Sequence, residues 1–195
     1  PSKGVTVSDG YAYVADADAA LDVIDVSEPL SPVLVGRVAT TGPVQAVAVS
    51  GDRAYLGCAD GLQIIDIESP LEPIIIGGMH TAGSARGIAV SGNLVCLTEV
   101  GGAGLLAIDV SEPQSPHVVG SLTVRVDPTV GDVVIAGNHV YVAGWNGLYA
   151  VDVTHPSSPA PLGPGLQGTA SDVTVSDDIA YVCGDRQLRL IDVSD

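Results

Sequence analysis

The 195-residue sequence contains no Phe, one Trp and one Met. Val, Ile, Leu and Ala must therefore fill its core, because 46% of the residues are hydrophobic and the mean hydropathy is +0.39. This composition excludes a disordered chain, and β-branched residues at such density favour strands. No stretch has the 3.6-residue period of an amphipathic helix, which excludes helical solenoids. We expect a single all-β domain.

Basic residues are also scarce, with seven Lys and Arg against 23 Asp and Glu and a formal charge of −16. Such a charge repels phosphate backbones and anionic lipids, so we expect no nucleic-acid partner. No apolar run approaches the roughly 18 residues of a spanning helix, which argues against direct membrane insertion. The sequence opens PSKGVTVS without the features of a signal peptide. We expect any targeting segment to have been removed or to lie outside this sequence.

Cysteines are few and odd in number: Cys58, Cys96 and Cys183. Their spacing does not match a metal site, so we expect three small core residues and no disulfide. The four histidines fall at different positions of the repeat described below. They are therefore not expected to form a metal site or an acid–base pair.

What the sequence does contain is a repeat of 40 to 43 residues, marked by the Asp of LDVIDVSEP, LQIIDIESP, LLAIDVSEP, LYAVDVTHP and LRLIDVSD. Each unit has an alternating apolar run, a turn of Gly, Asp or Asn, and a second run that carries Tyr in four of the five units. The Asp-containing run follows, then in the first four units an S-x-P-x-x-P loop and a fourth apolar run. Four short strands per unit predict a β-propeller of four-stranded antiparallel blades. The expected blades span residues 3–44, 45–85, 86–130, 131–170 and 171–195.

The pattern L-x-V/I-I/V-D-V-S-x-P-x-x-P, followed by Gly, resembles the LVIVD repeat, a β-propeller repeat of bacterial and archaeal proteins. All five units match it, over nearly the whole chain. The resemblance implies a propeller that is often secreted or located at the cell surface, with no single shared activity and no catalytic motif. The fifth unit departs from the pattern, because it has neither the proline loop nor the fourth strand.

Two interpretations of this missing outer strand compete. The chain is part of a ring of six to eight blades, which we favour, or it is a five-bladed ring whose open edge a partner covers. Open strand edges in propellers are normally short and protected, so either interpretation predicts a neighbour at the last blade.

The repeated aspartates invite a catalytic hypothesis, because five carboxylates lie at one level. A residue that every unit needs is more simply explained by the turn after it. We expect Asp25, Asp66, Asp109, Asp152 and Asp192 to accept backbone hydrogen bonds in that turn.

Candidate binding residues are those at which the units differ. In a propeller, the loops between second and third strands, and the entries to the first strands, crowd one face around the central channel. The entry positions are Lys3, Gln45, Arg86, Gly131 and Ser171. The partner- or ligand-binding candidates are Trp145, Asn146, Arg86, Glu99, Asp185 and Arg186.

Trp145 lies in the short loop Gly144–Gly147 and is a candidate interface anchor, since exposed aromatics often serve this role. The alternative is that it caps the channel or packs against a neighbouring loop. Asp16, Asp18 and Asp60 form a weak candidate calcium site, because carboxylates on neighbouring loops suit that ion. Against this, Asp in a turn usually bonds its own backbone. No other cofactor is expected.

These observations lead to a function hypothesis that rests on preserved structural residues and missing catalytic constellations. We expect a non-catalytic protein-interaction scaffold in an extracytoplasmic or envelope-associated assembly, located in the periplasm, at the cell surface or outside the cell. The alternative is a propeller enzyme, a hydrolase or lyase, or a small-ligand binder, with or without calcium. It would use the polar residues around the channel, namely Asp16, Asp18, Arg86, Glu99 and Asp185.

Overall fold

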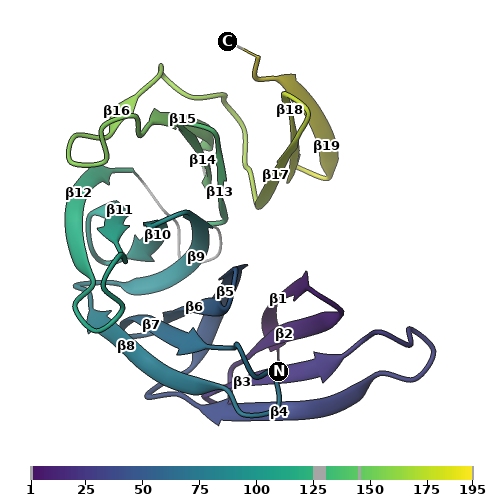
Figure 1. Ribbon diagram of the computed structural model, residues 1–195. Helices are drawn as coiled ribbons and strands as arrows, with labels where there is room; N and C mark the ends of the chain where they lie inside the picture. Colours follow the sequence, from purple (N-terminus) through teal and green to yellow (C-terminus); the bar gives the residue numbers. More distant parts are fainter. Residues whose placement is uncertain (1, 125–130, 145, 195) are drawn as a thin grey trace.

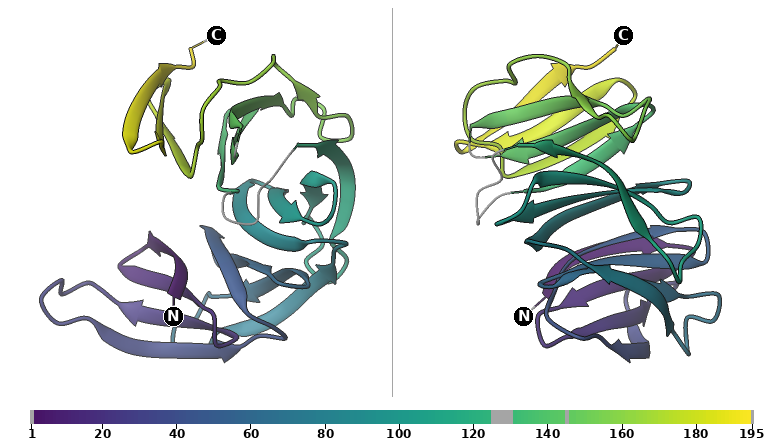
Figure 2. Two further views of the ribbon diagram at one scale, coloured as in Figure 1. Left: turned by 180° about the vertical axis from the view of Figure 1, so that it is seen from behind. Right: turned by 90° about the vertical axis from the view of Figure 1, so that its left-hand side faces the viewer.

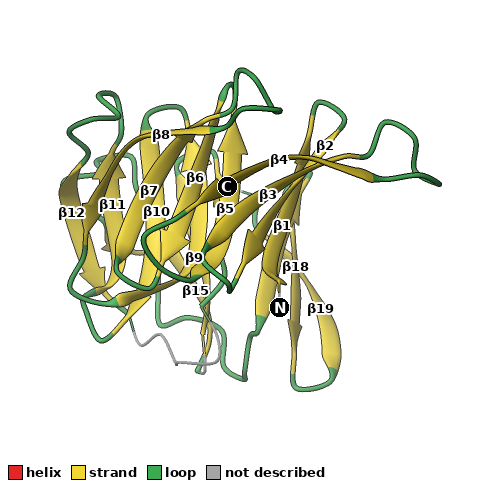
Figure 3. Cartoon of the chain, turned by 90° about the horizontal axis from the view of Figure 1, so that it is seen from below, coloured by secondary structure: helices red, strands yellow, loops and turns green. Residues whose placement is uncertain are grey.

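The computed structural model describes residues 2–124, 131–144 and 146–194. These residues form five antiparallel sheets set in an arc, and Figure 1 shows the arc open between the first and last sheets. We call the sheets blades 1 to 5 in chain order. The described residues contain strands, turns and loops and no helix (Figure 3). The predicted propeller architecture is confirmed, including a last blade with three strands.

Strand order within each blade follows the chain, so every connection is between neighbouring strands. Blade 1 contains β1 (Ser2–Ser8), β2 (Tyr11–Asp16), β3 (Ala20–Asp25) and β4 (Val33–Ala39). Blade 2 contains β5 (Val44–Ser50), β6 (Arg53–Cys58), β7 (Gly61–Asp66) and β8 (Ile74–His80). Blade 3 contains β9 (Ser84–Ser91), β10 (Leu94–Val100), β11 (Gly104–Asp109) and β12 (His117–Thr123).

Blades 4 and 5 are smaller. Blade 4 contains β13 (Val133–Ala136), β14 (His139–Gly144), β15 (Gly147–Asp152) and the two-residue β16 (Ala160–Pro161). Blade 5 contains β17 (Asp172–Ser176), β18 (Ile179–Gly184) and β19 (Gln187–Asp192). The short β16 agrees with the prolines of its sequence, since proline cannot donate to a strand ladder.

The first strand of each blade lies on the inner side of the arc, and the fourth lies outside (Figures 1 and 2). Neighbouring first strands contact one another from β1 to β5, β9, β13 and β17. The sheets therefore stand around a common centre, with their first strands lining it.

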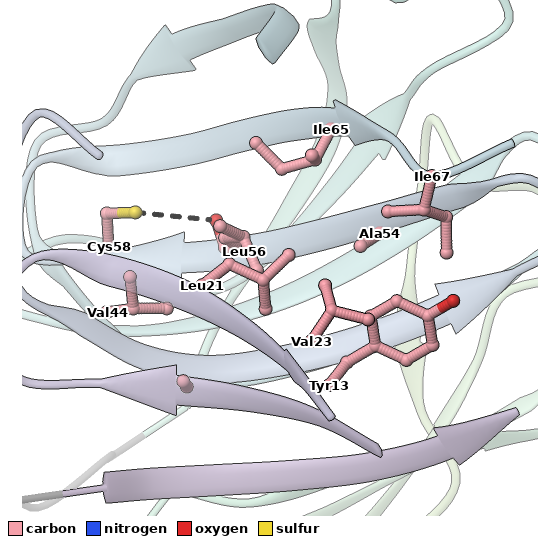
Figure 4. Packing of buried hydrophobic residues seen from close by; sticks show 10 residues of the cluster. Tyr13, Leu21, Val23, Val44, Ala54, Leu56, Cys58, Ile65 and Ile67 are labelled. Atoms are coloured by element: carbon pink, nitrogen blue, oxygen red, sulfur yellow. Dashed lines mark hydrogen bonds between the residues drawn. The ribbon is translucent and has the colours of Figure 1, made fainter. Parts of the chain in front are cut away.

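The hydrophobic core is divided into four clusters, one at each contact between neighbouring blades. Figure 4 shows the first, where Tyr13, Leu21 and Val23 of blade 1 pack against Leu56 and Ile65 of blade 2. Successive side chains along a strand point to opposite faces of the sheet, so each strand packs one set of side chains against the blade on either side. The Tyr position of the repeat is accordingly buried in blades 1 to 4, where it holds Tyr13, Tyr55, Cys96 and Tyr141.

The proline loops lock neighbouring blades together. In the outer strands, a Cβ atom added at Gly36, Gly77 or Gly120 would overlap the carbonyl oxygen of Pro70, Pro113 or Pro156, respectively. Each of these prolines belongs to the loop of the next blade. The repeat therefore needs glycine here because backbone from another blade approaches closely.

The repeated aspartates stabilise the turn that leads into each proline loop. In every blade, Oδ1 of the aspartate accepts a hydrogen bond from the backbone N–H two residues later, over 2.7 to 3.0 Å. The prediction of a structural role for these five residues is confirmed.

Candidate interaction site

A pocket of about 590 Å³ lies at the centre of the arc, where the first strands begin. All five entry positions of the sequence analysis line it, together with Asp132 and Asp172. The entry positions lie just before these strands or in their first three residues, so the arc brings five chain segments from five blades to one place. We call this pocket the channel end.

Charges are segregated around the channel end. Blades 1 to 3 contribute Lys3, Gln45 and Arg86, whereas blades 4 and 5 contribute Asp132 and Asp172. Arg86 Nη1 lies 3.5 Å from Gln45 Oε1, and the buried Nε of Arg86 has no hydrogen-bond partner among the described residues. A ligand with an anionic and a cationic group would find a complementary group on each side.

Asp132 and Asp172 form a pair of interacting carboxyl groups. Burial, together with the hydrogen bond and the charge repulsion between Asp132 and Asp172, raises the pKa of Asp132 to about 7. The Val173 N–H donates to Asp132 Oδ2 over 3.2 Å, which limits the rise. Asp132 therefore binds or releases a proton near neutral pH.

Sequence reasoning missed this carboxyl pair, although a signal for it was present. The position after the entry residue is small in the first three units, where it holds Gly4, Ala46 and Gly87. In the fourth and fifth units the same position holds Asp132 and Asp172. Comparing this second position between units would have found both.

Glu99, one of the binding candidates, is buried where two loops meet. Its side chain is 2% exposed, and its carboxylate accepts the Gly83 N–H over 3.0 Å and the Ala103 N–H over 2.8 Å. It therefore holds two loops together. The sequence could not separate this role from binding, because both roles place a carboxylate where the units differ in sequence.

The remaining loop candidates differ in their surroundings. Asp185 accepts hydrogen bonds from the backbone N–H of Thr169, over 2.8 Å, and from its hydroxyl, and these bonds lower its pKa. Asn146 and Arg186 are exposed. Trp145 lies outside the described residues, so its role as an anchor stays a prediction.

Two of the calcium candidates, Asp16 and Asp60, have hydrogen-bond partners within the protein. Asp16 Oδ1 accepts the Asp18 N–H over 3.1 Å, and Asp16 Oδ2 lies 3.4 Å from Arg37 Nη2. Asp60 Oδ2 accepts the Thr41 hydroxyl over 3.1 Å. Within residues 2–124, 131–144 and 146–194, no group of three His, Cys, Asp or Glu side chains is placed to hold a metal ion. The calcium site stays a prediction without support from this geometry.

Apolar side chains are exposed on the two outward faces at the ends of the arc. On blade 1, Val5 and Val7 are 64% and 65% exposed, although their equivalents Val47 and Val49 pack against the preceding blade. The face of the β1–β4 sheet that carries Val5 and Val7 is the blade 1 free face.

Blade 5 also exposes apolar side chains, on the face that in the other blades packs against the following blade. Leu188 and Leu190 are 59% and 62% exposed, whereas their equivalents Leu62 and Ile64 are fully buried between blades 2 and 3. Cys183 is also exposed here, which corrects its prediction as a core residue, because no described sheet follows blade 5. We call this surface the blade 5 free face.

Comparison with known proteins supports the repeat assignment. The LVIVD repeat model matches residues 2–40, 41–81, 82–124, 129–163 and 167–195. No curated protein matches the chain. The part of the chain that the structure describes includes no helix that would cross a membrane.

Several solved structures are similar to the chain. A functionally unknown protein from Desulfotomaculum acetoxidans DSM 771 is 14% identical, with a TM-score of 0.79 over 97% of this chain and 68% of that one. BamB from Moraxella catarrhalis is 15% identical, with a TM-score of 0.72 over 97% of this chain and 60% of that one.

A chain of the Mitotic Checkpoint Complex is 13% identical, with a TM-score of 0.80 over 98% of this chain and 61% of that one. At these identities the likeness shows the fold alone. The chain spans between 60% and 68% of the length of these three structures.

Proposed function

Since the chain belongs to the LVIVD repeat family, we propose that it is a non-catalytic protein-interaction scaffold whose free faces bind a protein partner. The observation that carries this proposal is the exposure of apolar side chains on both free faces. Contiguous exposed apolar surface on a folded protein marks a contact with another macromolecule. A sheet face is flat and extended, so a protein surface covers it better than a small molecule does.

The magnitude of the effect supports association. Burying a fully exposed leucine side chain stabilises by about 1.5 to 3 kcal/mol. Leu188 and Leu190 are 59% and 62% exposed, so covering both contributes about 2 to 4 kcal/mol. A domain's whole stability is about 5 to 15 kcal/mol. Two residues on one free face therefore carry enough energy to matter for both folding and binding.

One of the similar structures is a chain of a complex, the Mitotic Checkpoint Complex, which agrees with an interaction role. We further propose an extracytoplasmic or envelope-associated location. Membership of the LVIVD repeat family supports it, because proteins with this repeat are often secreted or located at the cell surface. Fractionation of cells that express the native gene tests this location.

The interaction proposal is tested with a double substitution on the blade 5 free face. Quantitative affinity capture with the wild-type chain should recover a stoichiometric partner, and L188E/L190E should lose it. Leu71→Glu is the matched control, because Leu71 is 62% exposed but lies in a proline loop. Equal capture by the wild-type chain and L188E/L190E would contradict the proposal, as would the absence of any partner.

A second candidate function is binding of a small zwitterion at the channel end. It is favoured by the opposite charges on the two sides of one pocket. Arg86 and Lys3 would bind a carboxylate, and Asp132 and Asp172 would bind an ammonium group. Isothermal titration with free amino acids tests it.

Arg86→Gln and Asp132→Asn should each weaken zwitterion binding at least tenfold. Arg53→Gln should not, because Arg53 begins β6 after the turn at the opposite end of the strands. A heat signal that is unchanged in Arg86→Gln would exclude the channel end as the binding site.

A further inference from the structure

Besides the channel end, a pocket of about 200 Å³ lies against β7 and β8, the two outer strands of blade 2 (Figure 1). Leu62, Ile75 and Met79 are its large apolar lining residues. Its polar lining residues come from the turn before β7, from β7 and β8, and from the segment between blades 1 and 2; they are Thr41, Asp60, Gln63 and His80. Blade 2 has a described neighbour on each side. We call this the blade 2 pocket.

A chain of hydrogen bonds fixes the orientation of Gln63 in this pocket. The Thr41 hydroxyl donates its single hydrogen to Asp60 Oδ2 over 3.1 Å. Thr41 Oγ1 therefore accepts its second hydrogen bond from the amide of Gln63, so Gln63 Nε2 faces Thr41. The other end of the amide, Oε1, then faces away from Thr41.

The Oε1 atom of Gln63 is a buried acceptor without a donor. The side chain is 8% exposed, and Oε1 has no hydrogen-bond partner among the described residues. A buried carbonyl oxygen that accepts no hydrogen bond destabilises the folded state, and such atoms are rare in proteins. A ligand that brings an N–H group to Gln63 would remove this cost.

The repeat itself does not need this polar set. The positions of blade 3 that are equivalent to Thr41, Asp60 and Gln63 hold only apolar side chains, namely Ala82, Ala103 and Leu106. Blade 3 nevertheless forms the same four-stranded sheet. Packing between blades therefore does not account for the polar residues of the blade 2 pocket.

The charge at this pocket selects a cation. The Asp60 side chain is 39% exposed, and the exposed His80 places its Nδ1 3.7 Å from Asp60 Oδ2. The formal charge of −16 also draws cations toward the protein. An ammonium group carries three hydrogens, so it can donate to a carboxylate and to an amide oxygen at the same time.

The size and the apolar lining define the rest of the ligand. An apolar cavity of roughly 150 Å³ takes up benzene, so a pocket of about 200 Å³ suits a molecule only slightly larger. We propose that the blade 2 pocket binds a small primary amine, with its ammonium group at Asp60 and Gln63 and its apolar body against Ile75 and Met79. This proposal uses neither the free faces nor the channel end, so it is tested independently of the proposed function.

Met79 supplies a reporter for the experiment, because it is the only methionine in the chain. Isotope labelling of the methionine methyl group therefore gives one NMR signal, which lies in the blade 2 pocket. Titration of the 195-residue chain with isopentylamine at pH 7 should shift this signal saturably. Isopentanol has the same shape without the charge and should bind at least tenfold more weakly, because charge-assisted hydrogen bonds are lost. Isovalerate, an anion, should not bind.

Protein variants test the two polar contacts. Gln63→Leu removes the acceptor and introduces the residue that blade 3 has at this position, and it should weaken isopentylamine at least tenfold. Asp60→Asn should do the same. Asp52→Asn is the matched control, since it removes an exposed carboxylate from the turn at the other end of β6. Its affinity should stay within twofold of wild type, and thermal melts of all three variants confirm folding.

Three results would overturn the proposal. The first is the absence of a saturable shift of the Met79 signal with isopentylamine. The second is equal binding of isopentylamine and isopentanol, or equal affinity of wild type and Gln63→Leu. The third is binding of N-acetyl-lysine amide as tight as that of isopentylamine, which would assign the pocket to a lysine side chain of a protein and not to a free amine.

Discussion

Gly77 in the outer strand of blade 2 lies so close to the carbonyl oxygen of Pro113 in blade 3 that a Cβ atom would overlap it. The contact joins backbone to backbone, so neither partner moves aside without distorting a strand or a loop. It recurs between blades 1 and 2 and between blades 3 and 4. The glycine and the proline of the repeat are therefore two halves of one contact between neighbouring blades.

Gly77→Ala should destabilise the protein by about 1 to 3 kcal/mol, the usual cost of overpacking a filled site. Chemical denaturation measures it. Gly42→Ala is the control, because the nearest atom to an added Cβ there is Asp60 Oδ1, at 3.8 Å. Equal stability of the two variants would mean that the Gly77 contact relaxes freely.

Glu99→Ala should cost about 2 to 4 kcal/mol, because it leaves the N–H groups of Gly83 and Ala103 without their acceptor in a buried place. Glu112→Ala, at an exposed loop position, should stay within about 0.5 kcal/mol of wild type. The comparison uses unfolding in urea. If the two variants unfold together, the loops do not depend on Glu99.

Asp132→Asn should stabilise the protein at pH 8 and have little effect near pH 4. The folded-state pKa of Asp132 is raised to about 7, above its unfolded value of 3.8, so the unfolded state ionises first. Wild-type stability therefore falls as pH rises from about 4 to 7, and the asparagine variant escapes this loss, on the order of 4 kcal/mol. Melting temperatures across this range measure it, and a pH-independent difference would contradict the assignment.

The turn aspartates should give the opposite pH dependence. Hydrogen bonds from Ser111 lower the pKa of Asp109, so its stabilising contribution is present above the unfolded pKa and is lost as pH falls below about 4. Asp109→Asn keeps an oxygen acceptor and should lose less stability between pH 4 and 2 than wild type. Asp109→Ala should be weaker than both at pH 7. Parallel acid-unfolding curves for wild type and Asp109→Asn would contradict this.

Alkylation should distinguish the three cysteines. Burial raises the pKa of Cys58 and Cys96 to about 12, whereas Cys183 is exposed on the blade 5 free face. The folded protein should incorporate one equivalent of iodoacetamide within minutes, and the unfolded protein three. Peptide mapping identifies the site. Rapid labelling of Cys96 would show that blades 3 and 4 open readily.

The architecture was predictable because each unit repeats both its apolar alternation and its turn residues. The spacing of Asp25, Asp66 and the later aspartates defined the blades, and the need for that residue in every unit identified its turn role. The convergence of Lys3, Gln45 and Arg86 was also predictable, since equivalent positions in a ring lie at equivalent places.

Features that depend on what surrounds a residue were not predictable from one unit. Glu99 belongs to a segment whose sequence varies between units, and only the fold shows that the Gly83 N–H reaches its carboxylate. Cys183 matches buried positions in other blades, yet blade 5 has no described sheet beyond it. The sequence shows that Asp132 and Asp172 stand at repeat positions that hold Gly4 and Ala46 in earlier units. It does not show that two blades bring these carboxyl groups close enough for Asp172 to raise the pKa of Asp132.

The contact between Gly77 and Pro113 has a direction along the chain, since each proline loop reaches back to the blade made before it. During synthesis, blade 2 emerges from the ribosome with its outer strand complete before the proline loop of blade 3 emerges. The proline loop of each new blade can therefore pack at once against the outer strand of the preceding blade, which is already complete. Synthesis order and assembly order coincide, and a nascent chain stalled after any blade already holds every contact of this kind that its length permits.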